Sequence, residues 1–155
     1  MKKLIFTGAI IISSIFSFSA IAQMSDEDAA AAIKRRQSVF QILSHSNGPI
    51  GQMARGGDFD AAAAELALRR VAMVAPMIPE VLAVDTRGSS GGATRAIDAI
   101  WDSQDDIAAL AQDLVDGATE ALAVLESQGA DGIRQIATQL VGPKCGACHD
   151  RFRSN

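Results

Sequence analysis

Tyrosine is absent from the 155-residue chain, and aromatic residues make up only 5% of it. No stretch alternates apolar and polar side chains with the period of two that is typical of a half-buried strand. The chain has 14 basic and 18 acidic side chains, a formal net charge of −4, and no basic cluster. The missing strand pattern predicts an all-α fold, and the acidic balance argues against nucleic acid as a partner.

The first 22 residues have the pattern of a secretory signal. Lys2 and Lys3 precede an uncharged apolar run at 4–18, and the A-x-A sequence Ala20-Ile21-Ala22 follows. A helix that spans a membrane needs about 20 apolar residues, which this run does not reach. We therefore expect cleavage after the A-x-A site, export to the periplasm and no membrane anchor, so that residues 23–155 form one mature domain.

Glycine and proline divide the mature chain into four helical segments. Apolar side chains recur in them at spacings of three, four and seven residues, which is typical of helices that pack nearly parallel to one another. Short connections and one longer loop at 85–92 favour an antiparallel four-helix bundle. The expected helices span residues 26–54, 58 to a closure at Pro76 and Pro79, 94–127 and 131–153.

The same residues predict interruptions. Gly48-Pro49 is expected to kink or break the first helix near its end. Gly129 is expected to end the third helix, and Gly142-Pro143 to make the fourth helix irregular. The loop at 85–92 is expected to be too polar and too rich in glycine to pack as an element.

The C-terminal sequence Cys145-Gly146-Ala147-Cys148-His149 is the strongest chemical motif. A helix turns by about 100° per residue, so the two thiols lie one turn apart and His149 lies on the same face. Thiols placed in this way can add to the two vinyl groups of one porphyrin while the imidazole reaches its iron. We predict one covalent haem c, bonded to Cys145 and Cys148, with His149 as the axial iron ligand.

Two other chemistries also use paired cysteines. A thioredoxin-like thiol–disulfide oxidoreductase has its C-x-x-C motif near a strand, and this chain has no strand pattern. A zinc site needs a further pair of ligands, and the only other histidine is His45. Both alternatives are therefore weaker than haem attachment.

Short pieces around the haem motif carry a resemblance that spans nearly the whole mature chain. They are Lys34-Arg35-Arg36-Gln37, Gly48-Pro49, Arg55-Gly56, Phe59-Asp60-Ala61-Ala62, Ile100-Trp101 and the segment 144–153. In order and spacing the chain resembles the cytochrome c′ family, the class II c-type cytochromes. That resemblance implies a four-helix bundle with its haem motif near the C-terminus.

The resemblance also implies roles for residues of the first helix. Arg36 and Gln37 would lie at the haem edge, and Phe40 would lie opposite His149 across the haem. Low-spin relatives have a ligating methionine at the position of Phe40, so the resemblance implies five-coordinate, high-spin iron here. Helical spacing independently places Arg36 and Phe40 on one face, from which the arginine can pair with a haem propionate.

Two further arginines are candidates for the haem surroundings. Arg153 follows His149 by one helical turn, and the resemblance places it beside the proximal imidazole, where it could meet nitric oxide bound on that side. Arg95, expected at the start of the third helix, is a second candidate for a haem propionate. The family commonly forms homodimers through its first two helices, and we expect the same here.

We expect a periplasmic cytochrome that transfers electrons, binds nitric oxide and carbon monoxide, or both, and that is not an enzyme. The sequence does not identify the redox partner.

The alternative is a low-spin electron carrier of the same fold with His45 or Met53 as the sixth ligand. His45 is turned by about 140° from Phe40 around the helix, and Met53 lies beyond Gly48-Pro49.

Overall fold

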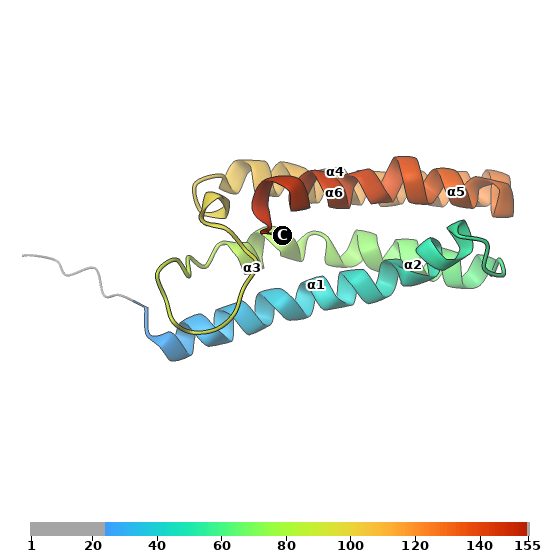
Figure 1. The fold of residues 1–155 in the computed structure, drawn as a ribbon. Helices are drawn as coiled ribbons and strands as arrows, with labels where there is room; N and C mark the ends of the chain where they lie inside the picture. The colour runs from blue at the N-terminus through green and yellow to red at the C-terminus, as the bar shows by residue number, and fades with distance from the viewer. Residues whose placement is uncertain (1–23, 155) are drawn as a thin grey trace, which may run out of the picture.

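Four helical segments run antiparallel in the computed structural model, which describes residues 24–154 (Figure 1). Within this range there is no strand, so the predicted all-α four-helix bundle is confirmed. None of the described helices combines the length and the apolar character needed to cross a membrane. The predicted signal at 1–22 lies outside the described residues. The elements are α1 (Asp26–Ala54), α2 (Ala61–Val74), α3 (Met77–Leu82), η1 (Asp98–Ile100), α4 (Gln104–Gln128), η2 (Gly129–Gly132), α5 (Ile133–Gln135), a π-helical stretch (Ile136–Val141) and α6 (Gly142–Phe152).

Helix α1 has the predicted bounds and is not broken at Gly48-Pro49, where the sequence predicted a kink or a break. Its N-terminus is capped by Ser25, whose hydroxyl accepts a hydrogen bond of 3.1 Å from the backbone N–H of Asp28. The helix continues through Pro49, although proline cannot donate the backbone bond of a helix interior. Ile50 follows directly and is 1% exposed, so packing against the core holds the chain in helical conformation across the proline.

The second segment is two helices where one was expected. Asp60 caps α2 by accepting a hydrogen bond of 3.0 Å from the N–H of Ala63, and α2 ends two residues before Pro76. Pro79 does not close this segment, as the sequence had predicted, because it lies in the first turn of α3. A proline is tolerated there, since the first N–H groups of a helix have no partner within it.

The bundle core lies where α2 packs between α1 and α4. Alanines occupy many of the buried positions, which lets the helix axes approach closely. On α2 the helical spacing of the sequence predicts a buried stripe of Ala64, Ala67, Val71 and Val74, and all of these are buried except Val74, which is only partly buried. The small buried residues of this interface include Ala64, Ala67, Ala111, Ala118 and Ala121.

The third long helix begins ten residues later than the sequence predicted. Residues 95–97 instead pair with the C-terminal tail: the N–H of Ile97 donates to the carbonyl of Phe152 at 3.3 Å, and the N–H of Ser154 donates to the carbonyl of Arg95 at 2.8 Å. This pairing with a distant segment overrides the local helical pattern. Arg95 is therefore not at the start of a helix. The predicted end at Gly129 is confirmed, since α4 stops at Gln128.

The last helical segment is irregular directly before Gly142-Pro143, the position at which the sequence predicted an irregularity. A π-helical stretch at 136–141 leads into α6, which has Pro143 in its first turn. A side chain at Gly142 would clash with the carbonyl oxygen of Ala137, so glycine is required where the π-helical stretch meets α6. The motif with the two cysteines starts directly after this junction.

Candidate functional site

The motif of paired cysteines lies on α6, as the sequence predicted. Cys145 and Cys148 are free thiols, both half-buried and packed against the hydrophobic core. His149 is exposed. Because the helix rises by about 1.5 Å per residue, the thiols are separated by roughly one turn. The three side chains therefore have the relative placement that covalent porphyrin attachment requires.

The local electrostatics do not favour a redox-active thiol pair. Burial raises the pKa of Cys145, and burial followed by the charge of Cys145 raises the pKa of Cys148. A catalytic cysteine needs the opposite shift, because the thiolate is its reactive form. Burial, then Arg153, and to a smaller extent Arg95, lower the pKa of His149 and favour the neutral imidazole that binds metals.

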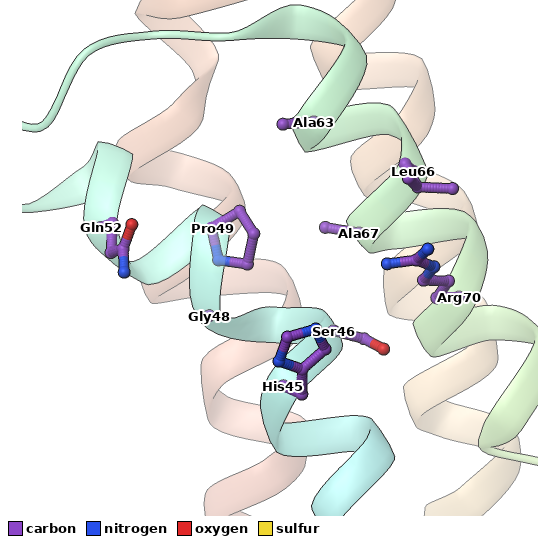
Figure 2. Close-up of a pocket in the computed structure, with 9 residues that line it drawn as sticks. All are labelled: His45, Ser46, Gly48, Pro49, Gln52, Ala63, Leu66, Ala67 and Arg70. Carbon is purple, nitrogen blue, oxygen red and sulfur yellow. The ribbon is translucent and has the colours of Figure 1, made fainter.

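The other alternative, a zinc site with His45, is not supported either. His45 lies in a groove of about 380 Å³ between α1 and α2, beside Pro49 and Arg70 (Figure 2). In residues 24–154, no three side chains of His, Cys, Asp or Glu gather as a metal site. His45 and the C-terminal motif therefore belong to different parts of the bundle.

Arg36 is buried at 2% exposure, so it does not lie on a solvated rim of the bundle. Its guanidinium donates to the hydroxyl of Thr94 at 3.0 Å and to that of Thr86 at 3.5 Å. It also lies 5.7 Å from the ring centroid of Trp101. Burial lowers the pKa of Arg36, and no carboxylate among the described residues pairs with it. A buried cation without a counter-ion is suited to bind an anionic group.

The connection at 83–103 covers this arginine. Its glycine-rich loop at 85–92 forms no helix or strand, as the sequence predicted, yet hydrogen bonds hold it against α1. Thr86 is 7% exposed, and the side-chain amide of Gln37 donates to the carbonyl of Ala93 at 2.9 Å. Gly91 lies so close to α1 that an added Cβ would come within 2.6 Å of the Asp26 carbonyl oxygen. Polar side chains and a close glycine contact therefore fasten the connection to α1.

Three residues of the connection escaped the sequence analysis as site residues. Thr86 and Thr94 hydrogen-bond Arg36, and Trp101 flanks it while donating from Nε1 to the carbonyl of Val84 at 2.9 Å. A single threonine in a polar loop has no sequence pattern that would identify it as a site residue. Trp101 belonged to a piece that carried the family resemblance, which is the one signal that pointed to it.

The residues of the candidate site come from two helices, α1 and α6, which pack against different elements. Helix α1 packs against α2, α3, α5 and the π-helical stretch, whereas α6 packs against α4, η1 and the π-helical stretch. In Figure 1, α1 and α6 diverge toward the end of the bundle that carries the long connection. Phe40 from α1 is half-buried and packs on the same core cluster as Cys145 and Cys148 from α6. These residues and the unpaired cation of Arg36 fit a covalently held porphyrin with acidic side groups.

The sequence model of the cytochrome c′ family, described as "Cytochrome C'", matches residues 31–153. The chain belongs to the cytochrome c′ family. It is 32% identical over 126 residues to cytochrome c-556 of Agrobacterium fabrum, with 81% of this chain and 82% of that protein covered. It is 30% identical over 130 residues to cytochrome c′ of Cereibacter sphaeroides, with 81% and 85% covered.

Solved structures agree with this assignment. The cytochrome c′ structure from Rhodobacter sphaeroides superposes with a TM-score of 0.72 at 25% identity, and covers 83% of this chain and 98% of that one. The structure of cytochrome c′ from Shewanella frigidimarina gives 0.69 at 28% identity, with 83% and 98% covered. Membership of the cytochrome c′ family implies covalently bound haem c, and the two cysteines of this chain lie near its C-terminus.

Proposed function

We propose that this cytochrome c′ family member holds five-coordinate, high-spin iron in its haem c, transfers electrons, and binds nitric oxide and carbon monoxide. The observation that carries the proposal is Phe40. It lies one helical turn from Arg36 on α1 and, like Cys145 and Cys148 of α6, is half-buried and packs against the hydrophobic core. A phenyl ring has no lone pair to donate, so with His149 on one side the other side of the iron keeps no protein ligand.

The relatives carry three kinds of name, cytochrome c′, cytochrome c-556 and cytochrome c-554, so the family alone leaves the sixth iron position open. The rival ligands of the low-spin alternative lie elsewhere in the bundle. His45 lies in the groove between α1 and α2. Met53 is 8% exposed within the core, 13 residues beyond Phe40, which is about 20 Å along a helix. This placement supports the five-coordinate proposal.

Haem c supplies the redox-active iron and the gas-binding position when it is bound. The chain's own residues decide how that position is used. Arg36, held between threonine hydroxyls and Trp101, would bind a propionate. Gln37, which donates to the carbonyl of Ala93 in the connection that covers Arg36, and Arg95, which belongs to that connection, are the further candidates for the haem edge. Phe40 offers no hydrogen bond to bound dioxygen and hinders any distal ligand by its bulk. Nitric oxide is therefore the expected preferred ligand, and Arg153 would meet it on the side of His149.

Two features of the proposal concern the whole protein. We infer that the segment 1–22 directs export to the periplasm and is removed, and that no catalytic turnover occurs. We also infer a homodimer through α1 and α2, because large apolar side chains are exposed there, among them Ile42, Leu66 and Met73. One cytochrome c′ of this fold shows ligand-controlled dimer dissociation, and a variant of the one from Alcaligenes xylosoxidans has been solved with carbon monoxide bound.

Visible spectra of the purified holoprotein, reduced and with or without carbon monoxide, test the proposal. We expect a high-spin ferrous spectrum that changes on addition of carbon monoxide. The low-spin alternative predicts a sharp spectrum that carbon monoxide leaves unchanged, and a thiol–disulfide oxidoreductase would be colourless.

The variant Phe40→Met should add a sulfur ligand and move the iron toward low spin, while Phe40→Leu, which adds no donor, should stay high-spin. An unchanged high-spin spectrum in Phe40→Met would remove Phe40 from the distal position. His149→Ala should keep haem attached but lose its protein ligand. A native spectrum in that variant would overturn the axial assignment.

A further inference from the structure

The groove between α1 and α2 is built from residues that take no part in the candidate haem site. Its volume of about 380 Å³ lies in the range of small-molecule sites in proteins. We call it the α1–α2 groove. Apolar side chains of both helices line it together with four polar ones, which are His45, Ser46, Gln52 and Arg70 (Figure 2).

Arg70 brings a positive charge to this groove. Within residues 24–154 no carboxylate lies within 4.0 Å of its guanidinium, and none of the residues that line the groove is acidic. Arg69, its neighbour on the same helix, pairs instead with Glu65 at 2.7 Å. Of these two adjacent arginines, only Arg69 therefore has a counter-ion in the described part of the chain.

Ser46 is a second polar group of the groove that has no partner. It is 2% exposed, and in Figure 2 its hydroxyl and the guanidinium of Arg70 reach into the space between the helices from opposite sides. Helical serines often donate to the carbonyl four residues earlier, as Ser38 does to Lys34 at 2.9 Å. Ser46 makes no side-chain hydrogen bond to any described residue. Its hydroxyl can therefore bond to a molecule in the groove.

These groups together fit an anion of single charge with an apolar body. A guanidinium matches the two oxygens of a carboxylate with parallel hydrogen bonds. The Ser46 hydroxyl and the His45 imidazole can each donate a further one. One arginine balances one negative charge, which disfavours anions of higher charge. Pro49 and Leu66 add apolar surface on which a hydrocarbon chain can pack.

We propose that the α1–α2 groove binds an organic monocarboxylate, with the carboxylate at Arg70 and Ser46 and the hydrocarbon body along Pro49 and Leu66. The proposal does not depend on how the haem iron is coordinated. A cation of the same shape would be repelled by Arg70, and a carboxylate without a hydrocarbon body would leave the apolar surface uncovered.

Equilibrium dialysis of the holoprotein against radiolabelled octanoate at 0.15 M salt tests the proposal. We expect saturable binding of one octanoate per chain, and an affinity roughly tenfold lower in Arg70→Gln, because hydrogen bonds to a charged group are among the stronger ones. Arg69→Gln is the matched control. It removes the same charge one residue away, from a side chain that does not line the groove, and should keep the parent affinity within about twofold.

Three further measurements separate the parts of the site. Ser46→Ala should weaken octanoate binding by about threefold, since it removes a single neutral hydrogen bond. Octylamine, which has the same chain with a cationic head, should not compete with octanoate. Acetate, which has the same head without the chain, should compete only at far higher concentration.

Several results would overturn the proposal. They are parent affinity in Arg70→Gln, an equal loss in Arg69→Gln, and competition by octylamine, which would mean adsorption to any apolar surface. A change in the visible haem spectrum on addition of octanoate would place the ligand at the haem and not in the groove. Absence of binding would also overturn the proposal. Sedimentation velocity of the parent and of Leu66→Arg would then show whether a second copy of the chain covers the groove.

Discussion

The α2–α4 interface and the 83–103 connection both hold the bundle together, but by different physical means. Between α2 and α4 the contacts are apolar, recur at helical spacing and involve many small residues, such as Ala64 and Ala118. The connection is held by directional polar contacts, chiefly those of Arg36 with Thr86 and Thr94. When one apolar contact is lost, the neighbouring apolar side chains still hold the interface together. Each polar contact, in contrast, depends on a single partner that is far away in the sequence.

The first prediction tests the apolar interface and has the largest expected effect. Leu68 on α2 is fully buried, and Leu68→Ala would leave a cavity there. We expect the free energy of unfolding to fall by about 2–5 kcal/mol, because the surroundings of a deleted core side chain collapse only partly. Guanidinium unfolding followed by circular dichroism measures this loss. The haem spectrum should stay the same, since the residue lies outside the site.

Met77→Ala is the matched control, because it truncates a large apolar side chain that is 42% exposed and lies on α3, outside the inferred dimer surface. Its free energy of unfolding should change by less than about 0.5 kcal/mol in the monomer. Equal losses in the two variants would mean that the α2–α4 contact is not the apolar core described above.

The second prediction tests the connection and has a smaller, local effect. Gly91→Ala would push a methyl group to within 2.6 Å of backbone atoms of Asp26 and Ala30. Overpacking of this kind costs about 1–3 kcal/mol, here in the free energy of local opening. Amide hydrogen exchange should therefore become faster in residues 84–97, while the amides of α2 and α4 keep their rates.

Gly48→Ala is the control for this exchange experiment, because an added Cβ at Gly48 meets no atom within 4 Å. It should leave the exchange of the connection unchanged. If Gly91→Ala accelerated exchange equally throughout the bundle, the connection and the apolar core would be one cooperative unit, and the contrast between them would be wrong.

The third prediction has the smallest effect and concerns pH. The Ser90 hydroxyl and N–H donate to the carboxylate of Asp26 and hold its pKa below the ordinary value of 3.8. A carboxyl with a lowered pKa contributes stability above its unfolded value and loses that contribution as the pH falls through the lowered one. Exchange at Ser90 and Gly91 should therefore speed up below about pH 4.

Asp26→Asn removes the titrating group. In that variant the exchange at Ser90 and Gly91, corrected for the intrinsic rate, should be faster at neutral pH and should no longer change in the acidic range. Asp28→Asn is the matched control, since Asp28 is exposed in the same first turn of α1 and its carboxylate accepts from Ser25, with no hydrogen bond to the connection. A persistent acid transition in Asp26→Asn would assign it to another group.

Much of the fold followed from local patterns. The bounds of α1, the end of α4 and the irregular last helix were all predicted, because caps, glycine and apolar spacing act within a few residues. The errors lie where distant segments meet. Pro49 stays helical because the core packs on Ile50, and α4 does not begin at residue 94 because residues 95–97 pair with the C-terminal tail. Only the short η1 follows before α4.

The candidate site shows the same division. The spacing of Cys145, Cys148 and His149 on one helix was predictable, since it depends only on helical geometry. The burial of Arg36 and its threonine partners was not, because Thr86 and Thr94 lie 50 and 58 residues away from it.

The sequence by itself determined an all-helical chain, its haem motif and its family, because these depend on residue type and on spacing along a helix. Only the tertiary structure decided that a polar connection covers Arg36 and that Arg95 meets the C-terminal tail at Ser154. The physical reason is that hydrogen bonds and charge interactions act over a few ångströms in space, whatever the separation of their partners in sequence.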